Sequence, residues 1–246
     1  MDAVPRIGRL FFGTAIALLG IQQIIGADFV QGPLIAPAWL PLRTSLAFLF
    51  GLALVVAGAG IALAPPRWAR QAAILLVVVL GLVFLLFHLP TPGPILRDGI
   101  ARTRAFETLA ILGVALVLSG PRAVTAGRVL FAVTLVVFGV QHFMYDVFVA
   151  AVIPAWIPAR MFWTCFTGVA FIAAGVSLMV GRAARLAAFW LGLMFFLWLI
   201  LLHVPRAAGS PGGQNEWNSA FVALAMCGAA WLLVPSPKDD ARPTTP

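Results

Sequence analysis

Four polar side chains lie close together near the middle of the chain: Gln141, His142, Tyr145 and Asp146. An imidazole can donate or accept a hydrogen bond, carry a proton near neutral pH or bind a metal ion. If the helix continues past His142, the Asp146 carboxylate four residues on can reach the ring and raise its basicity. Such a cluster can hydrogen-bond a quinone carbonyl and exchange its protons. We therefore predict a quinone site at His142 and Gln141. The alternative is a polar helix end without a ligand.

Three further residues are candidates for the same polar site: His88, His203 and Glu107. The two histidines each end an apolar run, where an amphipathic side chain also suits the membrane interface. Glu107 follows Arg104 by three residues, so it is either half of an interfacial ion pair or a proton acceptor facing a cavity. Haem ligation would need two facing histidines at one depth, such as His142 and His203, or one histidine with an open position, and nothing in the spacing specifies haem.

Metal and thiol chemistry have little support in the sequence. Cys165 and Cys227 lie far apart in apolar sequence, without the CxxC spacing of a redox pair, and should lie at different depths. No P-loop, HExxH, GxSxG or zinc-ligand spacing occurs. We therefore predict no metal site and name no catalytic residue, which leaves open whether the chain is an enzyme.

The composition shows what must hold these residues in place. Of the 246 residues, 62% are hydrophobic and 10% are charged, whereas soluble domains run near half and a quarter. This excludes a secreted disulfide scaffold, a disordered chain and a soluble enzyme. The net charge of +8 comes almost entirely from arginines scattered singly between apolar runs. A nucleic-acid partner would need them clustered on one face, so we exclude that partner.

The apolar runs predict an all-α polytopic membrane protein with eight transmembrane helices, because about 20 apolar residues cross a bilayer. The predicted spans are Ile7–Ile25, Thr44–Ala64, Trp68–Leu89, Arg104–Ser119, Gly127–Tyr145, Phe162–Val180, Leu186–Val204 and Trp217–Val234.

The basic residues predict the orientation, since the cytoplasmic side of a membrane protein is richer in Lys and Arg. One side carries ten of them: Arg6, Arg9, Arg67, Arg70, Arg122, Arg128, Arg182, Arg185, Lys238 and Arg242. The other side carries six: Arg43, Arg97, Arg102, Arg104, Arg160 and Arg206. We therefore expect both termini in the cytoplasm, and all three histidines at the outer ends of helices.

The two halves of the chain repeat each other in sequence. The matches keep their order, and their spacing drifts only from 119 residues (Gly8 to Gly127) to 115 residues (His88 to His203). Four spans per copy make the repeat parallel, with a two-fold pseudo-axis along the membrane normal. We predict four-helix bundles over 1–120 and 121–235, packed side by side, and a disordered cytoplasmic tail over 236–246.

A Pro-Ala-Trp-Leu/Ile-Pro element occurs once in each copy, at Pro37–Pro41 and Pro154–Pro158. Two prolines four residues apart cannot both lie inside a regular helix. The tryptophan between them suits the membrane–water interface. We read the element as an interfacial or re-entrant loop over the outer end of each bundle; a simple interface anchor is the alternative.

Together these features resemble the DoxX family of membrane proteins. The resemblance lies in Gly139–His142, the Trp-Pro loop, Gly168–Gly175, the Arg-x-x-Arg turn at Arg182 and Arg185, and the His-x-Pro at His203. The first copy departs from it, with Gln23 where the second has His142. The resemblance implies a bacterial plasma-membrane protein associated with quinone or thiol redox chemistry. It also implies a periplasmic or membrane redox protein as partner, besides the lipid bilayer.

Two other functions stay open from the sequence. A non-enzymatic assembly or scaffold protein fits the scarcity of polar residues in the span interiors. A small-solute transporter fits the repeat, but no polar line crosses the middle of the membrane.

Overall fold

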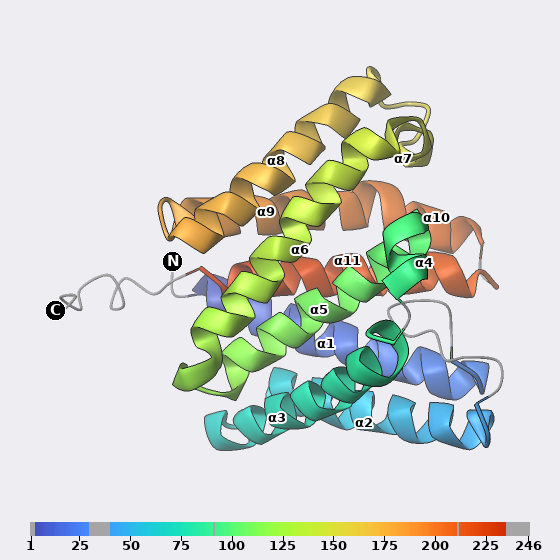
Figure 1. The fold of residues 1–246 in the computed structure, drawn as a ribbon, viewed down its shortest axis with the longest axis vertical. Helices are drawn as coiled ribbons and strands as arrows, with labels where there is room; N and C mark the ends of the chain where they lie inside the picture. Colours follow the sequence, from blue (N-terminus) through green and yellow to red (C-terminus); the bar gives the residue numbers. More distant parts are fainter. Residues whose placement is uncertain (1–2, 30–39, 91, 211, 235–246) are drawn as a thin grey trace, which may run out of the picture.

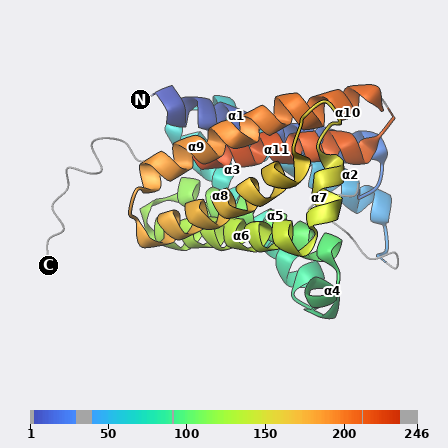
Figure 2. The ribbon, with the colours of Figure 1, turned by 90° about the horizontal axis from the view of Figure 1, so that it is seen from above.

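The computed structural model describes residues 3–29, 40–90, 92–210 and 212–234, and it is all-helical, with no strand among them. The predicted tail at 236–246 and the first-copy Pro37–Trp39 lie outside the described residues. The long helices run between the left and right sides of the molecule in both views, and α6 and α8 are the most steeply tilted in Figure 1 (Figures 1 and 2). They are α1 (Ala3–Gly26), α2 (Arg43–Leu63), α3 (Pro66–Val83), α5 (Gly99–Ser119), α6 (Val124–Met144), α8 (Arg160–Val180), α9 (Ala184–Trp198) and α11 (Gln214–Leu232).

Shorter segments extend or connect the long helices. The π-helical turns η1 (Phe84–His88) and η3 (Leu199–His203) continue α3 and α9, and a 3-10 turn η2 (Pro121–Ala123) precedes α6. The short helices are α4 (Pro92–Arg97), α7 (Asp146–Val152) and α10 (Val204–Gly209). Helix α1 begins and α11 ends at the same end of the molecule, opposite α7 and α10 (Figure 1).

The long helices form a closed ring that is narrowest in the middle, at a place that we call the pinch, where α5 and α11 contact each other. Each packs against the next along the chain, and α11 packs back against α1. Helices α5 and α11 also contact each other across the ring. They separate a first lobe (α1, α2 and α3) from a second lobe (α6, α8 and α9), as Figure 1 shows.

Glycines bring the helix backbones together. A Cβ on Gly8 of α1 would lie 2.9 Å from the carbonyl oxygen of Gly228 in α11, and one on Gly113 of α5 would lie 2.6 Å from that of Gly127 in α6. Within the lobes, Gly20 meets Gly51 and Gly139 meets Gly168 in the same way. Only residues without a side chain allow helices to approach so closely.

The membrane prediction is confirmed in its coarse form. Six helical segments are long and apolar enough to cross a bilayer: Ala3–Gly26, Arg43–Leu63, Pro66–His88, Pro121–Met144, Arg160–Val180 and Ala184–Gly209. The two other long helices, α5 and α11, are the pair at the pinch of the ring. Three charged residues (Arg102, Arg104 and Glu107) lie in the first half of α5, and α11 opens with a polar turn.

Each of the eight predicted ranges falls on one long helix, but the packing of the halves differs from the prediction. Instead of two separate four-helix bundles, the first helix of each half packs against the last helix of the other half. The first and last helices of the same half make no comparable contact. The glycine pairs explain the difference, because Gly8 meets Gly228 and Gly127 meets Gly113, both across the two halves.

Candidate functional site

His142 lies in the last turn of α6, and its ring packs against aromatic side chains of the second lobe. The ring centroid lies 5.2 Å from that of Phe171 on α8, edge to face, and 6.1 Å from that of Trp198 on α9, where the rings stack. Phe171 and Trp198 also meet edge to face at 6.0 Å. We call these three rings the aromatic box.

The hydrogen bonds of His142 define what its ring can offer a ligand. Nδ1 lies 2.8 Å from the carbonyl oxygen of Phe138 one turn earlier, and a carbonyl only accepts, so Nδ1 carries a proton. In the neutral ring Nε2 is then an acceptor. Nε2 is buried and has no hydrogen-bond partner among the residues that the structure describes. A buried polar atom without a partner costs about 1–3 kcal/mol, which a ligand that donates to it would recover.

The corresponding place in the first lobe holds no such box. A Cβ on Gly51 would lie 3.1 Å from the Cβ of Gln23 on α1, and a Cβ on Gly168 would lie 3.0 Å from the Cβ of His142 on α6. Gln23 and His142 therefore occupy matching places in the two lobes. The repeat spacing aligns Leu54 and Val83 with Phe171 and Trp198, and both are buried aliphatic side chains. The aromatic box therefore belongs to the second lobe alone.

Gln141 and Tyr145 point away from the box, toward α5. The Gln141 amide Nε2 donates to the carbonyl oxygen of Gly99 and to Thr103 Oγ1, both at 3.1 Å. Gly99 also faces the Tyr145 ring, which a Cβ at residue 99 would approach to 2.8 Å. Successive residues of a helix leave its axis in different directions, so Gln141 joins two helices while His142 faces the second lobe.

Asp146 does not reach His142. Helix α6 ends at Met144, and Tyr145, with φ −126° and ψ 37°, redirects the chain into α7. The Asp146 carboxylate accepts the backbone N–H of Val147 at 2.7 Å and makes no other hydrogen bond or ion pair with a described residue. The predicted carboxylate–imidazole pair required an unbroken helix, and the break separates the two groups.

The remaining candidates lie elsewhere. His88 is buried at the end of η1, with Nε2 3.4 Å from Thr108 Oγ1 of α5. Glu107 on α5 has neither a hydrogen bond nor a close ion pair with any described residue, although Arg104 attracts it electrostatically. His203 ends η3 and makes no ring contact with His142, so the structure does not form a facing histidine pair.

Metal and thiol sites remain without support in the described part of the chain. It contains no group of three or more His, Cys, Asp or Glu side chains that could hold a metal ion. Both cysteines are free thiols. Cys165 lies near the start of α8 and Cys227 near the end of α11.

Sequence reasoning missed Phe171 and Trp198. Both are apolar residues in apolar helices, so nothing local distinguishes them from ordinary core residues. The available signal was indirect: they stand where the first copy has Leu54 and Val83. Trp198 also directly precedes the π-helical turn η3, and such turns concentrate at functional sites.

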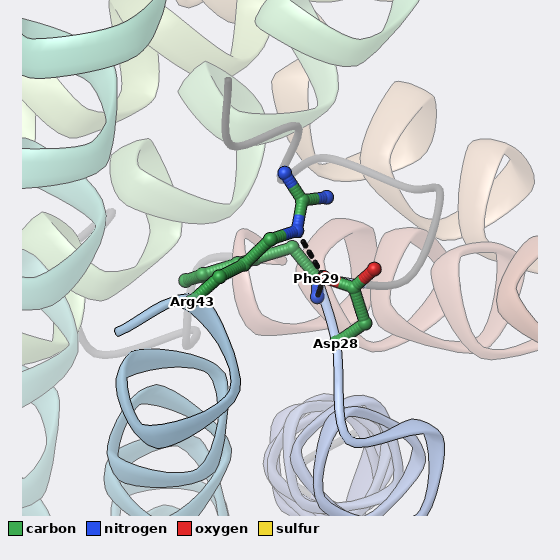
Figure 3. Close-up of polar contacts among 3 residues, drawn as sticks. All are labelled: Asp28, Phe29 and Arg43. Atoms are coloured by element: carbon green, nitrogen blue, oxygen red, sulfur yellow. Dashed lines mark hydrogen bonds and ion pairs between the residues drawn. The ribbon is translucent and has the colours of Figure 1, made fainter. Parts of the chain in front are cut away.

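In the first lobe, an ion pair joins Asp28, just after the end of α1, to Arg43, the first residue of α2 (Figure 3). The Arg43 side chain donates a hydrogen bond to Asp28 Oδ1, which also accepts the backbone N–H of Phe29. These bonds, that of Arg43 foremost, hold the pKa of the Asp28 carboxyl below its usual value. The Arg43 guanidinium also lies 5.9 Å from the Phe29 ring centroid.

Residues 131–234 match the model of a protein family described as a domain of unknown function (DUF8561). The match covers less than half of the chain, and it includes His142, Phe171 and Trp198. No curated protein and no solved structure matches the chain.

Proposed function

We propose that this protein is a quinone-associated membrane protein of DoxX-like type, and that it binds the reduced, quinol form in the aromatic box. The observation that carries the proposal is the buried, unpartnered Nε2 of His142 between two aromatic rings. The site lacks a hydrogen-bond donor to Nε2, and a quinol supplies one as a hydroxyl group on a flat aromatic ring.

The tautomer of His142 favours quinol over quinone. A quinone carbonyl only accepts hydrogen bonds, and Nε2 of the neutral ring also accepts. A quinol hydroxyl donates to Nε2, and its ring can stack on Trp198 as the imidazole does. Protonation at Nε2 would make the ring a donor and let it hold the quinone carbonyl instead. Oxidation of the quinol would pass its two electrons to a membrane or periplasmic redox protein and release two protons to water, one of them by way of Nε2.

The proposal includes eight spans, with both termini in the cytoplasm of a bacterial plasma membrane. Helices α5 and α11, with 21 and 19 residues, are long enough to join the six apolar segments. Their position at the pinch supports this, because helices sheltered by others can carry more polar residues than lipid-facing ones. Gly181→Cys and Gly209→Cys, each in a chain whose two native cysteines are replaced, test whether α5 crosses the membrane, since a membrane-impermeant thiol reagent should then label only the Gly209→Cys variant from outside the cell.

The proposal also includes a parallel repeat. Three kinds of structural feature recur at the repeat spacing: the glycine contacts, the π-helical turns η1 and η3, and left-handed residues before α2 and α8. Residue 42 has φ 52° and residue 159 has φ 55°. Such residues are uncommon outside glycine, so their recurrence supports a common origin of the halves.

The test of quinol binding uses His142→Phe in protein purified in mild detergent. Phenylalanine keeps an aromatic ring between Phe171 and Trp198 and removes the hydrogen-bond acceptor. Loss of one hydrogen bond should weaken the binding of short-chain ubiquinol and menaquinol analogues about tenfold. His203→Phe is the matched control, because His203 lies in the same lobe outside the box.

Equal quinol affinity in wild type and His142→Phe would refute the site. Protein that carries no extractable quinone and binds no analogue would refute the quinol function and favour a scaffold or assembly role. An absorption band of haem in the purified protein would also contradict the proposal.

A further inference from the structure

A groove with two arginines lies at the end of the second lobe where α7 and α10 meet the start of α8. It is a cavity of about 710 Å³, within the size range of ligand sites, and it opens to the surface. Its wall is mostly apolar, and no Asp or Glu of the described residues lines it. The residues that matter here are Phe148, Trp156, Leu201, Leu202, Arg160 and Arg206. We call it the Arg160–Arg206 groove.

Both arginines in the groove lack a counter-charge. Neither guanidinium makes a hydrogen bond or an ion pair with any described residue, and both side chains are exposed. Arg160 is also the first residue of α8, whose preceding residue, Ala159, provides no side-chain cap. The N–H groups of an uncapped helix start add to the positive potential there.

The first lobe shows how the same position is neutralised from within the chain. Arg43 begins α2 as Arg160 begins α8, each after a left-handed residue. Arg43 is paired with Asp28, as Figure 3 shows. Asp146 resembles Asp28 in accepting the N–H of the following residue, but it makes no ion pair with Arg160. The second lobe thus keeps the arginine and an aspartate, lacks the ion pair between them and adds Arg206.

We propose that the Arg160–Arg206 groove binds the phosphate headgroup of an anionic phospholipid. The two guanidinium groups match a phosphate, which arginine binds through paired hydrogen bonds. Leu201 and Leu202 offer an apolar wall for the first part of an acyl chain. Trp156 and Phe148, each 68% exposed, suit the interface between headgroups and hydrocarbon. A free phosphate ion would use the arginines but not this apolar wall.

The test compares lipid binding by the full-length protein in mild detergent, measured by native mass spectrometry. Wild type should bind phosphatidylglycerol at least about tenfold more tightly than phosphatidylcholine. Arg160→Gln and Arg206→Gln should each weaken phosphatidylglycerol binding about tenfold and leave phosphatidylcholine binding unchanged. Arg43→Gln is the matched control, because its arginine already has a carboxylate partner in the chain. The thermal midpoint of each variant checks that the fold is kept.

Three results would overturn the proposal. The first is a double variant, Arg160→Gln with Arg206→Gln, that binds phosphatidylglycerol like wild type. The second is an equal loss in Arg43→Gln. The third is displacement of the lipid by millimolar inorganic phosphate, which would make the groove a site for a free anion. The proposal does not depend on quinol binding, since the groove and the box share no residue.

Discussion

The contact between the first and last long helices can be tested by adding one methyl group. Gly8→Ala places a Cβ 2.8 Å from the backbone N of Leu232 and 2.9 Å from the carbonyl oxygen of Gly228. Ordinary contacts of this kind begin near 3.4 Å. The neighbours are backbone atoms that cannot rotate aside, so α1 and α11 must separate by about half an ångström. Overpacking of this kind costs about 1–3 kcal/mol.

The matched control is Gly81→Ala in α3, where a Cβ meets nothing within 4 Å. Alanine there should be neutral or stabilising, because it favours helix by up to about 1 kcal/mol over glycine. We expect Gly8→Ala to lower the thermal midpoint in mild detergent by about 2–12 °C, scaled from a loss of about 2–4 °C per kcal/mol. If Gly8→Ala and Gly81→Ala had the same midpoint, α1 and α11 would not pack as the structure has them.

Three further predictions follow from single contacts. Ala159→Gly should stabilise the protein by about 1 kcal/mol in thermal unfolding, because residue 159 has φ 55° and glycine adopts this conformation without strain. Ala187→Gly, inside α9, should destabilise it. Gln141→Leu should lower stability by about 1 kcal/mol through the lost bonds to Gly99 and Thr103, yet leave quinol affinity unchanged, which a binding measurement checks. Arg43→Gln should raise the pKa of Asp28 toward its usual value in a carboxyl NMR titration. Because the folded pKa of Asp28 lies below the unfolded one, wild type should be the more stable above the unfolded pKa, and this small advantage should vanish as pH falls through the folded pKa.

The helices were predictable from the sequence because their signal is local. A run of about 20 apolar residues requires a helix in a membrane, whatever surrounds it. Even α5 and α11, the two least apolar, were identified as long helices, because the repeat placed a fourth helix in each half. The pairing of helices was not predictable in this way. It depends on which glycines meet, and Gly8 could as well have faced a neighbour in its own half.

The candidate site was only partly predictable, for a related reason. His142 was identified from its residue type and its polar neighbours. The choice of those neighbours as partners was wrong for Asp146, because the end of α6 at Met144 depends on the three-dimensional course of the chain. Phe171 and Trp198, which surround the ring, come from helices α8 and α9 and carry no chemical signal in the sequence.

The two halves share a scaffold but differ wherever a polar group could meet a ligand. At the box, Gln23 among aliphatic side chains is replaced by His142 among aromatic ones. At the lobe end, Arg43 has its own carboxylate, whereas Arg160 has none among the described residues. At these two places Gln23 and Arg43 have partners within the chain, whereas the second lobe leaves one buried acceptor and two exposed cations without partners among the described residues. A ligand that donates to the buried acceptor would offset its cost in stability, and an anion would give the two arginines an ion pair, so the second lobe is the half in which we expect ligands to bind.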